Sequence, residues 1–291
     1  MLEIGQRGPP LRFGTCSWKY EAWRGIVYSD LPKLDYLAEY ARQFDCVEVD
    51  QWFWSLFGPD QVKLPDRELV ASYAASVPRG FRFAVKMPNS LTLTHVYPKS
   101  KTDALVPNPH FLSVELLNRV LDCLEPMQSK LGPLMFQFGY LNREMMPSQA
   151  AFLERLEAFA SWLPPGLEWC VEPRNPKWLN GDYFGLMRKL ELGHVFQQGY
   201  FMPPVYRVYG QFADQMTDRV VIRLHGPDRE GMDQRSGKDW SKIVEARDGE
   251  IHALARMLCD LRERKRKVWT FVNNHYEGCA PLTIKRIRER I

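Results

Sequence analysis

Charged and amide side chains follow several short apolar runs of the sequence, and they are of the types that bind anions or transfer protons. Two carboxylates, Glu48 and Glu172, and one imidazole, His225, are suited to acid/base catalysis. Arginine grips a carboxylate or a phosphate with two hydrogen bonds, and lysine supplies a point charge. We therefore expect Glu48, Glu172 and His225 to be catalytic. The expected ligand-binding residues are Lys86, Gln137, Arg174, Arg223, Asn273, Asn274, Trp18 and Tyr20.

Three kinds of chemistry fit these residue types. In the first, Glu48 and Glu172 form an acid/base pair, in which an arginine keeps one carboxylate ionised and burial raises the pKa of the other. In the second, acidic side chains and histidines bind a divalent metal. No His-x-His or His-x-x-x-His spacing supports a metal, and Arg223 would repel one, so we predict no cofactor. In the third, Cys16 or Cys279 is a nucleophile, although the sequence shows no activating environment.

The elements that must position these side chains alternate along the chain. Eight short apolar runs are typical of strands covered on both faces: 12–16, 46–49, 82–85, 134–138, 169–172, 194–197, 220–225 and 268–272. Helical spacing is found at 34–44, 65–76, 111–124, 148–162, 183–192, 250–261 and 282–291. This order predicts an α/β fold, a single closed (β/α)₈ TIM-like barrel over residues 1–291. The alternative is an open doubly wound sheet, but no Gly-x-Gly-x-x-Gly follows the first run.

In such a barrel, the catalytic groups lie at the carboxyl ends of the strands, which is where the candidate residues fall. A structural explanation stays open for some of them. Ion pairs of Arg223 with Glu48 or Glu172 would close this end of the barrel, and Asn273 and Asn274 would cap the helix that follows. The tryptophans and tyrosines either stack on a ligand or pack beneath long loops.

Composition sets the remaining limits. The 291 residues carry 39 Lys+Arg and 35 Asp+Glu, a net charge of +4, and are 45% hydrophobic, which excludes a mainly disordered chain. The six cysteines show no Cys-x-x-Cys spacing, so we expect free thiols and a cytoplasmic protein. Residues 1–10 have no secretory signal, and we expect them to be flexible. No apolar stretch is long enough for a membrane span, so we expect no membrane partner.

A series of motifs resembles the YecE-like family, domain of unknown function seventy-two. The segment 14–20, Gly-Thr-Cys-Ser-Trp-Lys-Tyr, is similar to the family's Gly-Thr-Ser-Gly-Trp-x-Tyr. The resemblance continues through 47–49, 83–86, 132–137, 171–178, 223–226 and 273–281. It implies a single TIM-like barrel and supports the candidate residues, but it brings no established reaction. The sequence departs from the family pattern at Cys16-Ser17, in the bulky stretch 50–54, and at Gln197, where an aspartate is expected.

Our leading hypothesis is a metal-independent enzyme, a hydrolase, lyase or isomerase, that acts on a polar anionic small molecule such as a sugar phosphate or a carboxylate. One alternative is a protein that binds DNA or cleaves its phosphodiester bonds with the cationic, Trp-rich rim. Another is a ligand sensor without catalysis. The segment 226–237, rich in Asp and Arg, is either a lid over the site or a mobile loop. The sequence leaves the oligomeric state open.

Overall fold

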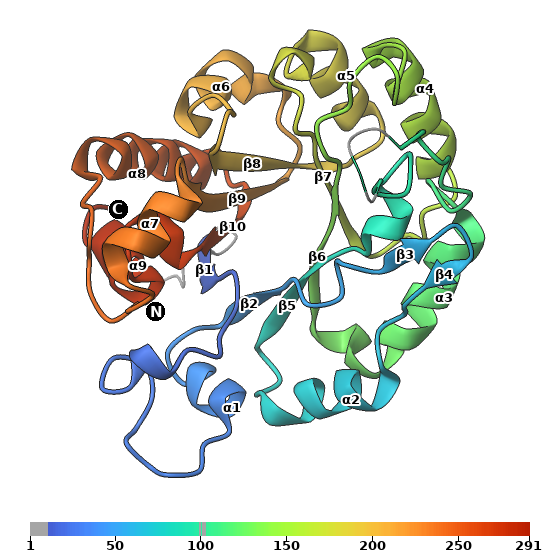
Figure 1. The fold of residues 1–291 in the computed structure, drawn as a ribbon. Coiled ribbons are helices and arrows are strands. Elements are labelled where there is room, and N and C mark those ends of the chain that lie inside the picture. Colours follow the sequence, from blue (N-terminus) through green and yellow to red (C-terminus); the bar gives the residue numbers. More distant parts are fainter. Residues whose placement is uncertain (1–10, 99, 101–102) are drawn as a thin grey trace, which may run out of the picture.

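The fold is a parallel barrel, as the alternation predicts. The computed structural model describes residues 11–98, 100 and 103–291, so the expected flexible segment 1–10 lies outside the described residues. Eight parallel strands form one sheet that curls on itself, with helices around the outside (Figure 1). The strands are β1 (Leu11–Thr15), β2 (Cys46–Val49), β5 (Arg82–Lys86), β6 (Leu131–Gln137), β7 (Glu168–Glu172), β8 (Gly193–Gly199), β9 (Arg219–Gly226) and β10 (Lys267–Val272).

Most outer helices begin at a residue whose side chain accepts a hydrogen bond from a backbone N–H of the first turn. Asp66 and Ser148 cap α2 and α4 in this way. The α-helices are α1 (Tyr36–Tyr40), α2 (Arg67–Ser76), α3 (Val114–Leu124), α4 (Gln149–Ala160), α5 (Gly181–Lys189), α6 (Val205–Phe212), α7 (Arg229–Ser236), α8 (Asp248–Glu263) and α9 (Ala280–Arg288). A hairpin of β3 (Leu56–Gly58) and β4 (Gln61–Val62) follows β2.

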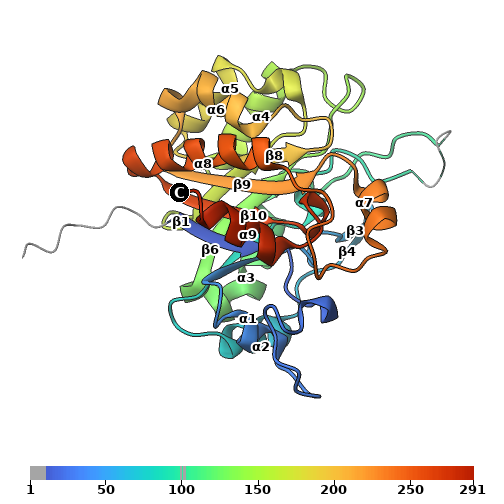
Figure 2. The same ribbon diagram turned by 90° about the vertical axis from the view of Figure 1, so that its left-hand side faces the viewer.

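The segment 226–237 is largely helical and is therefore not an irregular loop, while its role as a lid stays a prediction. Asp228 caps α7 by accepting a hydrogen bond from the Gly231 N–H, and Gly237 ends it with a φ of 58°. Asp233 on this helix lies 3.0 Å from Nε2 of His275. Figure 2 shows α7 and the β3–β4 hairpin at the end of the barrel toward which β9 points.

The ladder of hydrogen-bonded strands runs β1-β10-β9-β8-β7-β6-β5-β2, and within the described residues it does not join β1 to β2. The buried Tyr40 side chain bridges this seam. Its hydroxyl accepts a hydrogen bond from the Thr15 N–H at 2.9 Å and donates one to the Cys46 carbonyl at 3.1 Å. The two strands are close, since a Cβ on Gly14 would lie 2.2 Å from the Cys46 oxygen. Arg12 of β1 also pairs with Asp45, just before β2, at 2.8 Å. Side chains, and not a backbone ladder, thus join β1 to β2.

The interior of the barrel is a small core separate from the one beneath the helices. Its buried residues are Cys16, Cys46, Ala84, Met135, Cys170, Val195, Val221, Trp269 and Phe271. Side chains of a strand return to the same face after two residues. The residues two positions beyond six of these are Glu48, Lys86, Gln137, Glu172, Gln197 and Arg223. The interior therefore changes from apolar to charged toward the carboxyl ends of the strands, and this identifies the face that the sequence alone left undetermined.

Among the described residues, the longest helix is α8, and no helix combines the length and the apolar character needed to cross a membrane.

Candidate active site

Arg223 is the centre of a buried ion-pair network at the carboxyl end of the barrel. Its guanidinium contacts both oxygens of Glu48, with Nε–Oε2 and Nη2–Oε1 distances of 2.7 Å each. Its Nη1 lies 2.5 Å from Oε2 of Glu172. Both glutamates are fully buried, and Arg223 is 2% exposed. The ion pairs considered above as a structural explanation are therefore both present.

Arg174 and Gln137 extend the network on the side of Glu172. The Nε of Arg174 donates to Oε1 of Glu172 at 2.5 Å, and its Nη2 donates to Oε1 of Gln137 at 3.1 Å. The same Gln137 oxygen accepts from Nη1 of Arg223 at 3.2 Å. All four carboxylate oxygens of Glu48 and Glu172 thus accept from a guanidinium group. Two arginines balance two glutamates, which satisfies the requirement that buried charges be paired and hydrogen-bonded.

The charges around Glu172 keep its carboxylate ionised. Burial by itself would raise the pKa of this group, but Arg174 and Arg223 outweigh it and lower the pKa to about 2. At neutral pH, Glu172 in this arrangement is an anion that holds two guanidinium groups in place.

Lys86 carries a third positive charge at this end of the barrel, where the charges of Glu48, Glu172 and Asp50 act on it. Its Nζ lies 3.5 Å from the centre of the Phe53 ring, a cation–π contact. Among the described residues, Nζ has neither a hydrogen-bond acceptor nor an ion-pair partner, and the nearby Glu48 and Glu172 are paired with arginines. Burial and the neighbouring Arg223 lower the pKa of Lys86 to about 8.

His225 contributes a neutral imidazole. Its Nε2 lies 3.3 Å from Nη2 of Arg223. Since a guanidinium only donates, Nε2 must accept, and Nδ1 carries the proton. Nδ1 is buried without a partner among the described residues. Burial, and then the charges of Arg223 and Arg174, hold the pKa of His225 well below its ordinary value.

Two glycines bring the ends of β8 and β9 together beside His225. Gly199 has a φ of 116° and Gly226 a φ of 79°, which other residues rarely adopt. A Cβ on Gly199 would lie 2.1 Å from the Gly226 carbonyl oxygen. The close approach fixes the backbone that carries His225.

Asn273 and Asn274 cap the structure that follows β10. Asn273 Oδ1 accepts from the His275 N–H at 3.0 Å, at the start of a short 3₁₀ helix, η6 (Asn274–Tyr276). Asn274 Oδ1 accepts from the Ala280 N–H at 2.9 Å, at the start of α9. The capping role considered for these residues is thus observed. A role in ligand binding stays a prediction for both.

Trp18 and Tyr20 lie on the loop after β1. Trp18 is 9% exposed and packs edge-on against Tyr73, with ring centres 5.0 Å apart, beside a cavity of about 520 Å³. Tyr20 packs against Trp23, with ring centres 4.5 Å apart. Burial raises its pKa to about 12, and Cys16 and Asp50 add to the effect. The charges of Cys16 and Asp50 thus act on Tyr20, whereas Trp18 packs on Tyr73 in a neighbouring wall. A role in ligand binding stays a prediction for both.

Two aromatic residues at the site were not among the predicted ligand-binding residues. Phe53 lies beneath the Lys86 ammonium, as described above. The Tyr200 ring lies 5.4 Å from Cζ of Arg174 and 6.0 Å, centre to centre, from the His225 ring. Tyr200 directly follows the end of β8, so the rule that sites form at strand ends would have included it.

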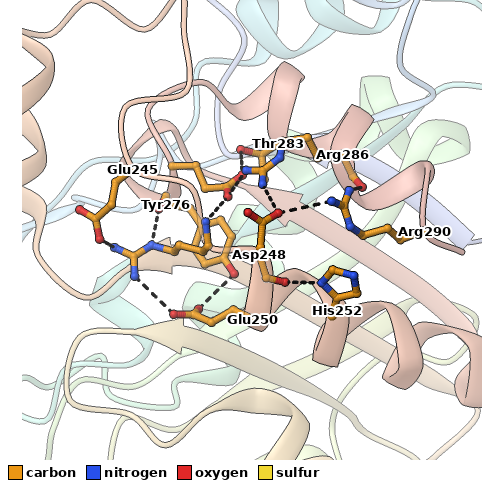
Figure 3. Close-up of polar contacts among 10 residues, drawn as sticks. Glu245, Asp248, Glu250, His252, Tyr276, Thr283, Arg286 and Arg290 are labelled. Carbon is orange, nitrogen blue, oxygen red and sulfur yellow. Dashed lines mark hydrogen bonds and ion pairs between the residues drawn. The ribbon is translucent and has the colours of Figure 1, made fainter.

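The polar residues just beyond η6 serve a different, structural network (Figure 3). Glu277 is fully buried and accepts hydrogen bonds from the Arg247 N–H at 2.7 Å, from the Thr283 hydroxyl at 2.8 Å and from Arg286. The Arg247 side chain in turn donates to the Tyr276 carbonyl at 2.7 Å. These contacts tie the start of α8 to η6 and α9, and none of them reaches Glu48 or Glu172.

The structure also bears on the metal and thiol alternatives. In the described part of the chain, no three His, Cys, Asp or Glu side chains are grouped as metal ligands. The Arg223 guanidinium lies between Glu48 and Glu172, where a cation shared by the two carboxylates would lie. Burial and the Glu48 charge raise the pKa of the Cys16 thiol well above its ordinary value, so this thiol is protonated and a poor nucleophile.

Comparisons with known proteins agree with this fold. A family model described as "Protein of unknown function DUF72" matches residues 12–291. A DUF72 family protein from Enterococcus faecalis V583 has a similar structure over 96% of this chain and 96% of that chain, with a TM-score of 0.66 and 19% identity. One from Thermotoga maritima MSB8 is similar over 96% of this chain and 99% of that chain, with a TM-score of 0.63 and 22% identity. No curated protein matches the sequence.

Proposed function

Because the chain belongs to the DUF72 family, whose description names no activity, we propose a function from the geometry of its own site. The protein is an enzyme that binds a polar, anionic small molecule, such as a sugar phosphate or a carboxylate, at the carboxyl end of the barrel.

The observation that carries this proposal is a group of cationic and neutral donors at the carboxyl end of the barrel that have no acceptor. Arg174 and Arg223 are balanced by the two glutamates, and Lys86 is left without a carboxylate partner among the described residues. In that same part of the chain, Nη1 of Arg174 and Nδ1 of His225 have no acceptor. An anion would supply acceptors for these donors.

In this proposal, Glu48, Glu172 and His225 are the catalytic residues. A ligand anion that pairs with Arg174 would weaken the contact that lowers the pKa of Glu172, so the carboxylate would become a stronger base when the ligand binds. The neutral His225 would donate a hydrogen bond from Nδ1 to a ligand oxygen and so polarise it, as a neutral imidazole can for a carbonyl.

Anion binding is the first step to test. Inorganic phosphate is titrated into the protein by calorimetry, and native mass spectrometry looks for an anionic metabolite retained through purification. Arg174→Gln should weaken phosphate binding by about tenfold, the loss of one charge-assisted contact. Arg67→Gln is the matched control, because Arg67 pairs with Glu125 on the exposed surface and should leave binding unchanged.

Equal phosphate affinity in wild-type protein and Arg174→Gln would contradict the anion site. Once a reaction is found, full activity of the double variant Glu48→Gln/Glu172→Gln would contradict the acid/base role.

A second candidate function, binding or cleavage of DNA, is favoured by one surface beside the site. A cavity of about 800 Å³ is lined by Tyr140, Arg143, Lys177 and Phe201, among others. Tyr140 and Phe201 are each 59% exposed, and exposed aromatic rings and cations are suited to stacking on bases and pairing with phosphates. DNA binding that weakens steeply with salt would support this function, and its absence at low salt would exclude it.

A further inference from the structure

We propose that Lys86 is a nucleophile that forms an imine with the carbonyl group of an anionic oxo compound, such as a 2-oxo acid or the open-chain form of a sugar phosphate. This inference deepens the function proposed above, since it rests on the same anion site and names the substrate class.

The first support is the position of the amine. Lys86 ends β5, and its half-buried side chain belongs to the interior-facing set that contains Glu48 and Arg223. Ligands of parallel barrels bind at this end. The Phe53 ring covers one side of the ammonium at 3.5 Å. An amine in this position is reachable from the rim and has an apolar surface beneath it.

The second support is that Lys86 has no acceptor, whereas its cationic neighbours have several. Arg223 donates to both glutamates, and Arg174 donates to Glu172 and Gln137. Among the described residues, neither an ion pair nor a hydrogen bond fixes the Lys86 ammonium. A half-buried ammonium without an acceptor is costly, so the fraction of neutral amine is larger than for an exposed lysine.

The electrostatics of the site agree with this geometry. Burial and the Arg223 charge lower the pKa of Lys86 from its ordinary 10.5 to about 8, against the opposing charges of Glu48, Glu172 and Asp50. A desolvated lysine beside another cation is the form that attacks carbonyl groups, since only the neutral amine has a free electron pair.

Lys130 offers an internal contrast within the same chain. Burial also lowers its pKa, but its Nζ donates to the Ala74 and Val77 carbonyls at 2.6 and 2.5 Å. It directly precedes β6, at the amino end of the barrel. Its amine is thus occupied by backbone acceptors and lies far along the barrel from the anion site.

The proposed step balances without a further reactant. The Lys86 electron pair attacks the carbonyl carbon and the C–N bond forms. One proton passes from the attacking nitrogen to the oxygen, a second comes from solvent, and the C–O bond breaks as the oxygen leaves as water. A neutral amine, a carbonyl and one proton give a protonated imine and one water. The imine carries the same positive charge as the ammonium, so the charge balance with Glu48, Glu172 and the arginines is preserved. The anionic group of the substrate pairs with Arg174, and His225 Nδ1 donates to the departing oxygen.

Reductive trapping tests the proposal on the full-length protein. Glyoxylate, an anionic aldehyde, or acetaldehyde, a neutral one, is added with cyanoborohydride, which reduces an imine to a stable secondary amine. Peptide mapping then compares the labelling rate of Lys86 with those of Lys130 and the exposed Lys63. We expect glyoxylate to label Lys86 about tenfold faster than Lys63 near pH 7.5, with half of the maximal rate reached near pH 8.

Labelling of Lys86 by both aldehydes no faster than that of Lys63 would overturn the proposal. In that case, phosphate binding that depends on Arg174 would still support the proposed function. Selective labelling of Lys86 by both aldehydes at equal rates would support the nucleophile and contradict the anion site. Arg174→Gln should slow labelling by glyoxylate alone, which a merely reactive lysine would not show. Lys86→Arg, which keeps the charge, is the control, and in this variant Lys63 and Lys130 should be labelled at unchanged rates.

Discussion

Replacing Glu172 with glutamine should remove a part of the protein's stability that depends on pH. The pKa of Glu172 in the folded protein is about 2, against an ordinary value of 4.5. Each unit of difference corresponds to about 1.36 kcal/mol, so the environment of this carboxylate stabilises the fold by about 3 kcal/mol at neutral pH. Because the folded pKa is the lower one, the stabilisation is complete above the unfolded pKa and is lost as the pH falls from 4.5 toward 2.

The assay is equilibrium unfolding in urea of wild-type protein and Glu172→Gln at several values from about pH 7 to pH 3. The difference in unfolding free energy between the two proteins should be largest at neutral pH. It should shrink by about 2 kcal/mol between pH 4.5 and pH 3, because that interval is 1.5 pH units.

A difference that stays constant over this range would refute the reasoning, since it would mean that Glu172 titrates alike in the folded and unfolded chain. Glu125→Gln is the matched control. Glu125 pairs with Arg67, but its side chain is 59% exposed, so its removal should have little effect on stability at any of these pH values.

Three further substitutions test the barrel around the site, each by urea unfolding. Arg223→Met should destabilise the protein by about 3–5 kcal/mol, because it leaves two buried carboxylates without their partner. A decrease in unfolding free energy below about 1 kcal/mol would show that the network is open to water. Tyr40→Phe should cost about 1–3 kcal/mol, since the Thr15 N–H loses its acceptor at the seam; an unchanged midpoint would mean that another group closes the seam. Gly14→Ala should lower the unfolding free energy by about 1–3 kcal/mol or more, because its Cβ would meet the Cys46 oxygen. If the variant were as stable as the wild-type protein, β1 and β2 could separate freely.

The strands were predictable from the sequence because strands covered on both faces are short, nearly continuous apolar runs. All eight were expected, with ends that differ by no more than three residues from those observed, as for the run expected to start at Leu134 in a strand that starts at Leu131. Two helices were not expected. α7 is almost entirely polar, so it shows no apolar stripe, and α6 is rich in valine and tyrosine, which favour strands.

The sequence predicted which residues form the candidate site better than it predicted how they contact one another. The position of each residue after a strand follows from the apolar run that precedes it. The pairing of Arg223 with Glu48, however, joins residues 175 positions apart. Such a pairing depends on the curvature of the sheet, which no short segment encodes. The same holds for Lys86, whose lack of a carboxylate partner follows from the arginines that bind its neighbours. Sequence alone could not separate a paired cation from an unpaired one.

Buried cysteines in the apolar interior of the barrel can report when the barrel opens. Three thiols, Cys16, Cys46 and Cys170, lie in that interior, and burial raises the pKa of each. They can react with an alkylating agent only when the barrel admits it. The Cys46 carbonyl belongs to the seam that Tyr40 bridges, so separation of β1 from β2 would expose this thiol first. The alkylation rate of Cys46 in the native protein, compared with that of Cys170, would therefore measure how often the seam opens without global unfolding.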